Sequence, residues 1–106
     1  MTIRTFTTAV CAVAASLIFI APAAAANGAG LYSAKSCIGC HGESGKKPVM
    51  ATYPKLAGQN KAYLLQQMKD IKSGARSNGN TALMKPIIGM VTPAEMEAIA
   101  TYLSGQ

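Results

Sequence analysis

The chain has 106 residues, which is room for one domain at most. Ten lysines and arginines stand against four aspartates and glutamates, so the formal net charge is +6. The basic residues are scattered and not run together, which argues against nucleic-acid binding and favours attraction to proteins with acidic surfaces.

The first 26 residues have the layout of a secretory signal peptide. Arg4 carries a positive charge, residues 6–20 form an apolar run, and residues 21–26 are small, with A-x-A cleavage choices after Ala24 or Ala26. The run is shorter than the about 20 residues that a membrane span needs. We expect export to the periplasm, removal of residues 1–26, and one domain at 27–106 without a membrane span; an uncleaved anchor is the alternative.

The mature chain would begin with a short helix over about residues 29–38, where helix-tolerant residues without proline lead to Cys37. Cys37-Ile38-Gly39-Cys40-His41 is a C-x-x-C-H run. In an exported chain this pattern indicates c-type haem attachment, with both thiols bound to the haem and the histidine bound to iron. A covalent haem would also complete the core of a domain too small to be comfortably stable alone.

A connection rich in glycine, lysine and proline spans residues 41–59. An irregular loop of this length usually has a function or packs against another group, such as a flat cofactor. An amphipathic helix is predicted over residues 60–73, ending at a cap on Gly74. In residues 76–90 the apolar residues follow neither a helical nor a strand periodicity. A last helix begins at the capping box Thr92-Pro93-Ala94-Glu95 and ends at Gly105. The pattern predicts three main helices and no strands.

The sequence resembles the class I c-type cytochromes, in particular the small soluble single-haem forms of the bacterial periplasm, whose domain also occurs doubled in two-haem relatives. The matching residues are Gly30, the C-x-x-C-H run with Gly42, Pro54-Lys55-Leu56-Ala57-Gly58-Gln59, Tyr63-Leu64, Gly74-x-Arg76, Met84-x-Pro86-Ile87 and Ala100-x-Tyr102-Leu103. The resemblance implies an all-α class I cytochrome c fold, with irregular loops and helices wrapped around one covalently attached haem. It also implies that the first helix crosses the last near Gly30 and Tyr102.

An electron carrier benefits from a second axial ligand, and a methionine thioether there favours ferrous iron. Met68 and Met96 lie on helical apolar stripes, which indicates core packing. Met50 follows His41 closely, although the chain between them could reach around the haem. Met84 and Met90 both precede the capped helix. The resemblance favours Met84, since the family's ligand stands about eight residues before the helix cap with a proline two places on; Met90 is the runner-up.

Two further residues are candidates for the haem surroundings. By the resemblance, the backbone carbonyl of Pro54 accepts a hydrogen bond from the second ring nitrogen of His41, which would strengthen the iron ligand. Arg76 suits a haem propionate because its planar donor fork matches a carboxylate, although an exposed arginine at a helix end is the plain alternative. Tyr53, Tyr63 and Gln67 are further candidates for the pocket lining.

We therefore expect a one-electron carrier that shuttles electrons between respiratory or dehydrogenase partners in the periplasm, and not an enzyme, although it could act as the cytochrome subunit of an oxidoreductase. A haem protein with an open iron, for gas sensing or catalysis, is the alternative. A thiol-disulfide oxidoreductase would need a strand pattern that is absent, and a structural zinc site would need a fourth ligand. A monomer with acidic redox partners, and no nucleic acid, is expected.

Overall fold

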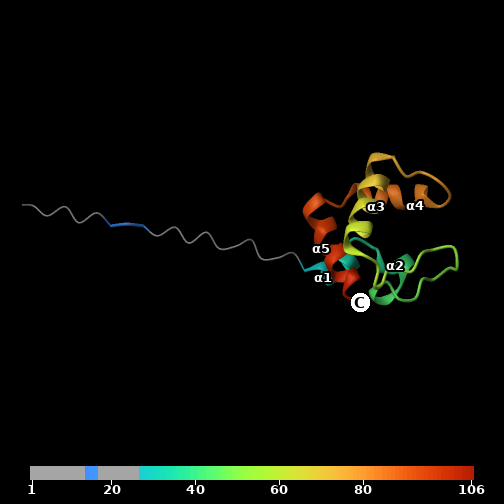
Figure 1. Cartoon of the computed structure of the whole chain (residues 1–106), viewed down its shortest axis with the longest axis horizontal. Helices are drawn as coiled ribbons and strands as arrows, with labels where there is room; N and C mark the ends of the chain where they lie inside the picture. The colour runs from blue at the N-terminus through green and yellow to red at the C-terminus, as the bar shows by residue number, and fades with distance from the viewer. Residues whose placement is uncertain (1–13, 17–26) are drawn as a thin grey trace, which may run out of the picture.

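The structure is a computed structural model that describes residues 14–16 and 27–106, so nearly all of the expected signal peptide, residues 1–26, lies outside the described residues. The described residues form helices and loops but no strand (Figure 1). The helices are α1 (Gly28–Ala34), α2 (Ile38–His41), a 3₁₀ turn η1 (Glu43–Gly45), α3 (Lys61–Ser73), α4 (Thr81–Gly89) and α5 (Pro93–Ser104). None of the helices in this part of the chain is long and apolar enough to cross a bilayer.

The first predicted helix is shorter than expected. Asn27 caps α1 by accepting a hydrogen bond from the backbone N–H of Gly30 at 3.2 Å. The helix ends at Ala34 and not at residue 38, because Ser36 adopts a left-handed backbone conformation with φ 66°. A separate turn, α2, then begins at Ile38. The C-x-x-C-H run therefore has its own local geometry.

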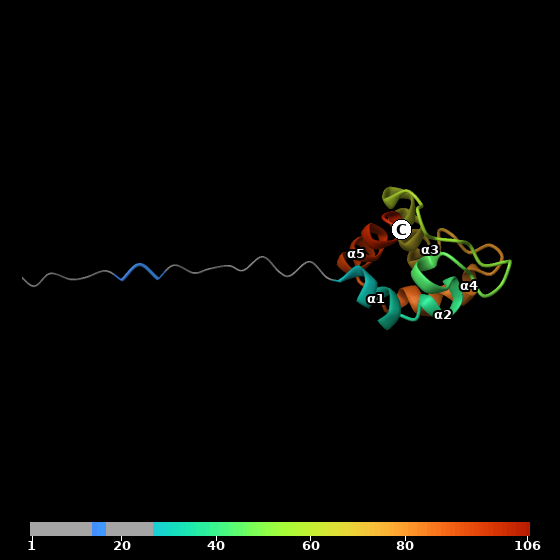
Figure 2. The ribbon, with the colours of Figure 1, turned by 90° about the horizontal axis from the view of Figure 1, so that it is seen from below.

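The two ends of the domain pack together, as α1 lies against α5 in both ribbon views (Figures 1 and 2). The expected crossing is present, but its glycine is Gly28 and not Gly30. A Cβ on Gly28 would overlap the carbonyl oxygen of Ala98 and lie 2.7 Å from the Cβ of Tyr102. A Cβ on Gly30 would come no closer than 3.4 Å, to the side chain of Asn27. The position that leaves no room for a side chain therefore lies two residues earlier than the resemblance implies.

Helices α3 and α5 confirm the sequence prediction. Asn60 caps the start of α3, and Gly74 ends it in the left-handed conformation with φ 87°. In α5, the Thr92 hydroxyl accepts from the Glu95 N–H while the Glu95 carboxylate accepts from the Thr92 N–H, at 3.2 and 2.9 Å. These reciprocal bonds satisfy two donors that a helix start otherwise leaves free.

Helix α4 was not predicted. Its sequence is apolar on most sides and contains Pro86, which cannot donate a backbone hydrogen bond. Nor does a side chain cap its start at Asn80. Short helices of this kind depend on tertiary packing for stability. Ile88 is buried at 2 % exposure, and α4 packs against α3, which supplies that packing.

The core lies where α1, α3 and α5 meet. Its largest fully buried side chains are those of Tyr32, Ile88, Val91, Met96, Ile99 and Leu103. The rings of Tyr32 and Tyr102 lie 5.8 Å apart at the α1–α5 crossing. The long loop between η1 and α3 leaves this core and returns to it through the N–H of Gly58, which donates to the carbonyl of Leu103 at 2.9 Å.

The helix crossing gives a first testable prediction. Gly28→Ala should destabilise the protein by about 1–3 kcal/mol, because the new methyl group meets backbone and the helices must move apart. Gly30→Ala is the matched control in the same helix, and it should be neutral or stabilising by up to about 1 kcal/mol, since alanine is the better helix former. Thermal unfolding measures both. Equal effects of the two substitutions would contradict the assignment of Gly28 as the contact.

Candidate metal and cofactor centre

The two motif cysteines stand at the wall of one large cavity and differ in exposure. Cys37 is buried, whereas Cys40 is exposed at its edge. Both are free thiols in this structure. Burial raises the pKa of the Cys37 thiol, and the neighbouring Cys40 adds to the rise.

The imidazole of His41 is held in one orientation. Its side chain is 5 % exposed, and Nδ1 lies 2.8 Å from the backbone carbonyl oxygen of Pro54. A carbonyl only accepts, so Nδ1 carries a proton, and in a neutral imidazole Nε2 would have the free lone pair. His41 lines the cavity, so its free nitrogen is available to a metal inside. The contact with Pro54 is the one that the family resemblance implies.

Gly42, directly after the histidine, fixes how the chain leaves the motif. It has φ 80°, and a Cβ there would overlap the carbonyl of Lys47. Its own carbonyl accepts a hydrogen bond from the Tyr32 hydroxyl at 2.7 Å. Burial, and to a smaller extent the neighbouring Cys37, raises the pKa of the Tyr32 hydroxyl to about 12. The hydroxyl therefore keeps its proton and stays a donor in neutral solution. Sequence analysis missed Tyr32, because nothing local distinguishes it from an ordinary core tyrosine.

The methionines separate clearly. Met84 is half-buried on α4 and lines the same cavity as His41. It lies on a helix, not in the loop where it was expected. Met90 is 61 % exposed and Met50 is 52 % exposed, and neither lines the cavity. Met96 is buried in the core as predicted, while Met68 packs at the core edge and lines the cavity as well.

Of the remaining candidate residues, some line the cavity and one does not. Arg76 Nη1 donates to the Gln67 side-chain oxygen at 3.1 Å, and both residues line the cavity. Tyr53 also lines it, with its ring centroid 6.5 Å from that of His41. Tyr63 does not: it is 53 % exposed and borders only a smaller neighbouring pocket.

The cavity has a volume of about 660 Å³, which is in the range of cofactor sites, about 300–1,000 Å³. Its apolar lining comes from Leu56, Leu64, Met68, Ile71, Leu83, Met84, Ile87, Ile88, Ile99 and Leu103. Residues of α2 and α4 both line the cavity, and in Figure 1 α4 lies above α2. The polar groups of the lining include two thiols, the imidazole of His41, the guanidinium of Arg76 and the side-chain amides of Gln67, Asn78 and Asn80. The donor set and the apolar lining fit a large flat cofactor with a metal and acidic substituents.

Comparison with known proteins agrees with this donor set. The model of the Cytochrome c family matches residues 25–106. A cytochrome c-553 from Nitratidesulfovibrio vulgaris is 35% identical over 96 residues, covering 90% of this chain and 92% of that protein. A cytochrome c4 from Azotobacter vinelandii is 35% identical over 71 residues, covering 66% of this chain. The chain spans only 34% of the length of that cytochrome c4.

A solved structure extends the likeness to the fold. The cytochrome c4 structure from Acidithiobacillus ferrooxidans superposes with a TM-score of 0.66 at 30% identity, covering 84% of this chain and 53% of that chain. The all-helical arrangement described above is thus the class I cytochrome c fold. The chain belongs to the cytochrome c family: it is a small class I c-type cytochrome with one covalently bound haem c.

Proposed function

We propose that this cytochrome is a periplasmic one-electron carrier whose iron is ligated on one side by His41 and on the other by Met84, with Cys37 and Cys40 holding the haem through thioethers. One observation carries the ligand assignment. Met84 and His41 line one cavity from separate helices, α4 and α2, and the two most exposed methionines are outside it.

Each ligand is suited to its side. The Pro54 carbonyl accepts from Nδ1 of His41, which orients the ring and makes Nε2 a stronger donor to a metal. The thioether of Met84 is a soft ligand that favours the ferrous state and raises the potential. Haem c, when bound, supplies an iron that alternates between the ferric and ferrous states. With His41 and Met84 both bound to it, the iron would offer no free position to small molecules.

Arg76 and Gln67 form a hydrogen-bonded polar pair in a mostly apolar wall. Only one of the five guanidinium donors of Arg76 is used in the bond to Gln67. The others are free to bind a haem propionate, and a guanidinium suits a carboxylate through paired hydrogen bonds. We assign this role to Arg76, with Gln67 orienting the guanidinium.

The exposed lysines support the proposal that the redox partner has an acidic surface. Within residues 27–106, ion pairs engage Lys35 with Glu95 and Lys61 with Glu97. Exposed lysines without a carboxylate in ion-pair distance there include Lys46, Lys47, Lys55, Lys69 and Lys85. Three of these belong to the loop that also supplies Tyr53 and Pro54 to the cavity wall. Positive charge beside the cofactor would steer an acidic redox partner to the place where the electron passes.

The first test concerns the sixth ligand. Met84→Ala should lower the reduction potential by part of the roughly 0.8 V range that axial ligands control, and the ferrous protein should bind carbon monoxide stoichiometrically. Met90→Ala is the control and should behave as the parent. A parent protein that binds carbon monoxide readily would instead favour the open-iron alternative, a gas sensor or catalyst. Redox titration and visible spectroscopy measure these outcomes.

A second test concerns export and haem attachment. Protein recovered from the periplasm should be coloured and should have the mass of residues 27–106 plus one haem, because the signal peptide is removed and the thioethers survive denaturation. A Cys37→Ser, Cys40→Ser variant should yield unmodified peptide mass. A colourless wild-type protein of peptide mass, or one that retains residues 1–26, would contradict the corresponding part of the proposal.

A third test concerns the partner. The rate constant for reduction by an acidic redox protein should fall at least about tenfold when ionic strength rises from about 0.01 M to about 0.5 M, because salt screens the attraction. Replacing Lys46, Lys47 and Lys55 together by glutamine should flatten this dependence, whereas the same change at Lys69 should alter it less. A rate independent of salt would count against electrostatic docking.

A further inference from the structure

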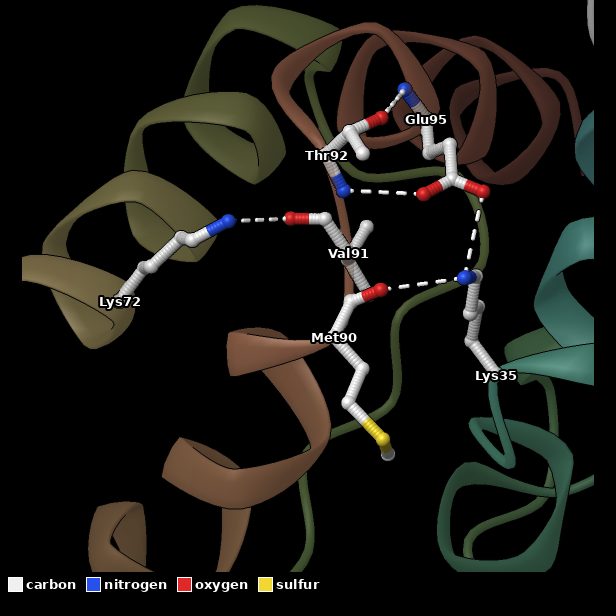
Figure 3. Close-up of polar contacts among 6 residues, drawn as sticks. All are labelled: Lys35, Lys72, Met90, Val91, Thr92 and Glu95. Atoms are coloured by element: carbon white, nitrogen blue, oxygen red, sulfur yellow. Dashed lines mark hydrogen bonds and ion pairs between the residues drawn. The ribbon is translucent and has the colours of Figure 1, made fainter.

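Two consecutive backbone carbonyls between α4 and α5 are each bound by a lysine from another part of the chain. Lys35 Nζ donates to the carbonyl of Met90 at 3.0 Å, and Lys72 Nζ donates to the carbonyl of Val91 at 2.6 Å (Figure 3). Lys35 follows α1, and Lys72 lies in the last turn of α3. We call these two lysines and the two carbonyls the lysine clamp.

Glu95 ties the clamp to the start of α5. Its Oε2 lies 3.3 Å from Lys35 Nζ, and its Oε1 accepts from the Thr92 N–H (Figure 3). The Lys35 and Glu95 side chains are only 25% and 21% exposed, so this is not an ordinary surface pair. The hydrogen bond with the Thr92 backbone, together with Lys35, lowers the pKa of Glu95, which keeps the carboxylate charged. Hydrogen bonds from charged donors are about twice as strong as neutral ones.

The clamped linker is also anchored in the core. Val91 has 0% exposure, so the stretch cannot shift without disturbing core packing. Helix α4 has weaker attachments: no side-chain cap at its start and a proline in its interior. Its C-terminal end is therefore the better-fixed end, and Met84 lies less than two turns from it.

We propose that Lys35 and Lys72 are positioning residues, which hold Met84 at the iron by clamping the linker that follows α4. The inference rests on the proposed ligation by Met84. The clamp also accounts for the choice between the two methionines. With its carbonyl held by Lys35, Met90 extends its side chain away from these polar contacts and is 61 % exposed, so its thioether does not compete for the cavity (Figure 3).

The test compares Lys72→Leu and Lys35→Leu with Lys61→Leu, all in the haem-loaded protein. Lys61 is the matched control for Lys72, because it lies on the same helix α3 and loses an ion pair to Glu97 on α5, but does not touch the linker. Either clamp substitution should raise the rate of carbon monoxide binding to the ferrous protein about tenfold and lower the reduction potential. A tenfold change corresponds to about 1.4 kcal/mol. Lys61→Leu should leave both close to the parent.

Two milder variants keep the test valid if a leucine variant folds poorly. Lys72→Arg retains a charged donor and should restore parent behaviour. Glu95→Gln keeps the oxygen that caps α5 but weakens the ion pair with Lys35, and it should give a smaller rise in carbon monoxide binding than Lys35→Leu.

The outcomes separate this inference from the proposal beneath it. Suppose that Met84→Ala lets the ferrous iron bind carbon monoxide while the clamp variants match Lys61→Leu. The clamp is then overturned and the ligand assignment stands. If Met84→Ala behaves as the parent, the ligand assignment fails and the clamp fails with it. The inference would be supported if Met84→Ala and both clamp variants increase carbon monoxide binding while Lys72→Arg binds it as the parent does.

Discussion

A cavity that the chain's own side chains do not fill lies within this fold, and most other features depend on it. Its apolar walls come from α3, α4, α5 and the loop before α3, so their burial from water is complete only with a cofactor in place. A domain this small has little other core. Thioethers from Cys37 and Cys40 would make the cofactor a permanent part of that core, and the polar groups at the wall can then be few.

Sequence analysis succeeded where structure is determined by neighbouring residues. The capping box at Thr92 and Glu95 and the left-handed cap at Gly74 are local hydrogen-bonding and backbone effects, so α3 and α5 were predicted nearly to their ends. The C-x-x-C-H spacing is equally local, and it indicated haem attachment before any fold was known. The family resemblance supplied what spacing could not: the partner carbonyl of His41, which the structure shows, and the preference for Met84, which stays a prediction.

It failed where distant segments decide the structure. Helix α4 has no side-chain cap at its start and contains Pro86, so its own residues do not favour a helix, and packing against α3 overrides them. The close contact of Gly28 with Ala98 joins residues that lie far apart in the chain, and no local pattern distinguishes Gly28 from Gly30. The lysine clamp was invisible for the same reason. Lys35 and Lys72 appeared as scattered surface charge, because their acceptors are backbone carbonyls that carry no signal in the sequence.

The packing of α1 on α5 has a consequence for the order in which the molecule can form. The first helix of the domain finds its main partner in the last, so the loop closed by this contact includes nearly the whole domain. Closing such a long loop is slow compared with forming the local helices. A chain that lacks its final residues therefore lacks the main surface on which α1 packs. Native structure must wait until the carboxyl-terminal helix has been made.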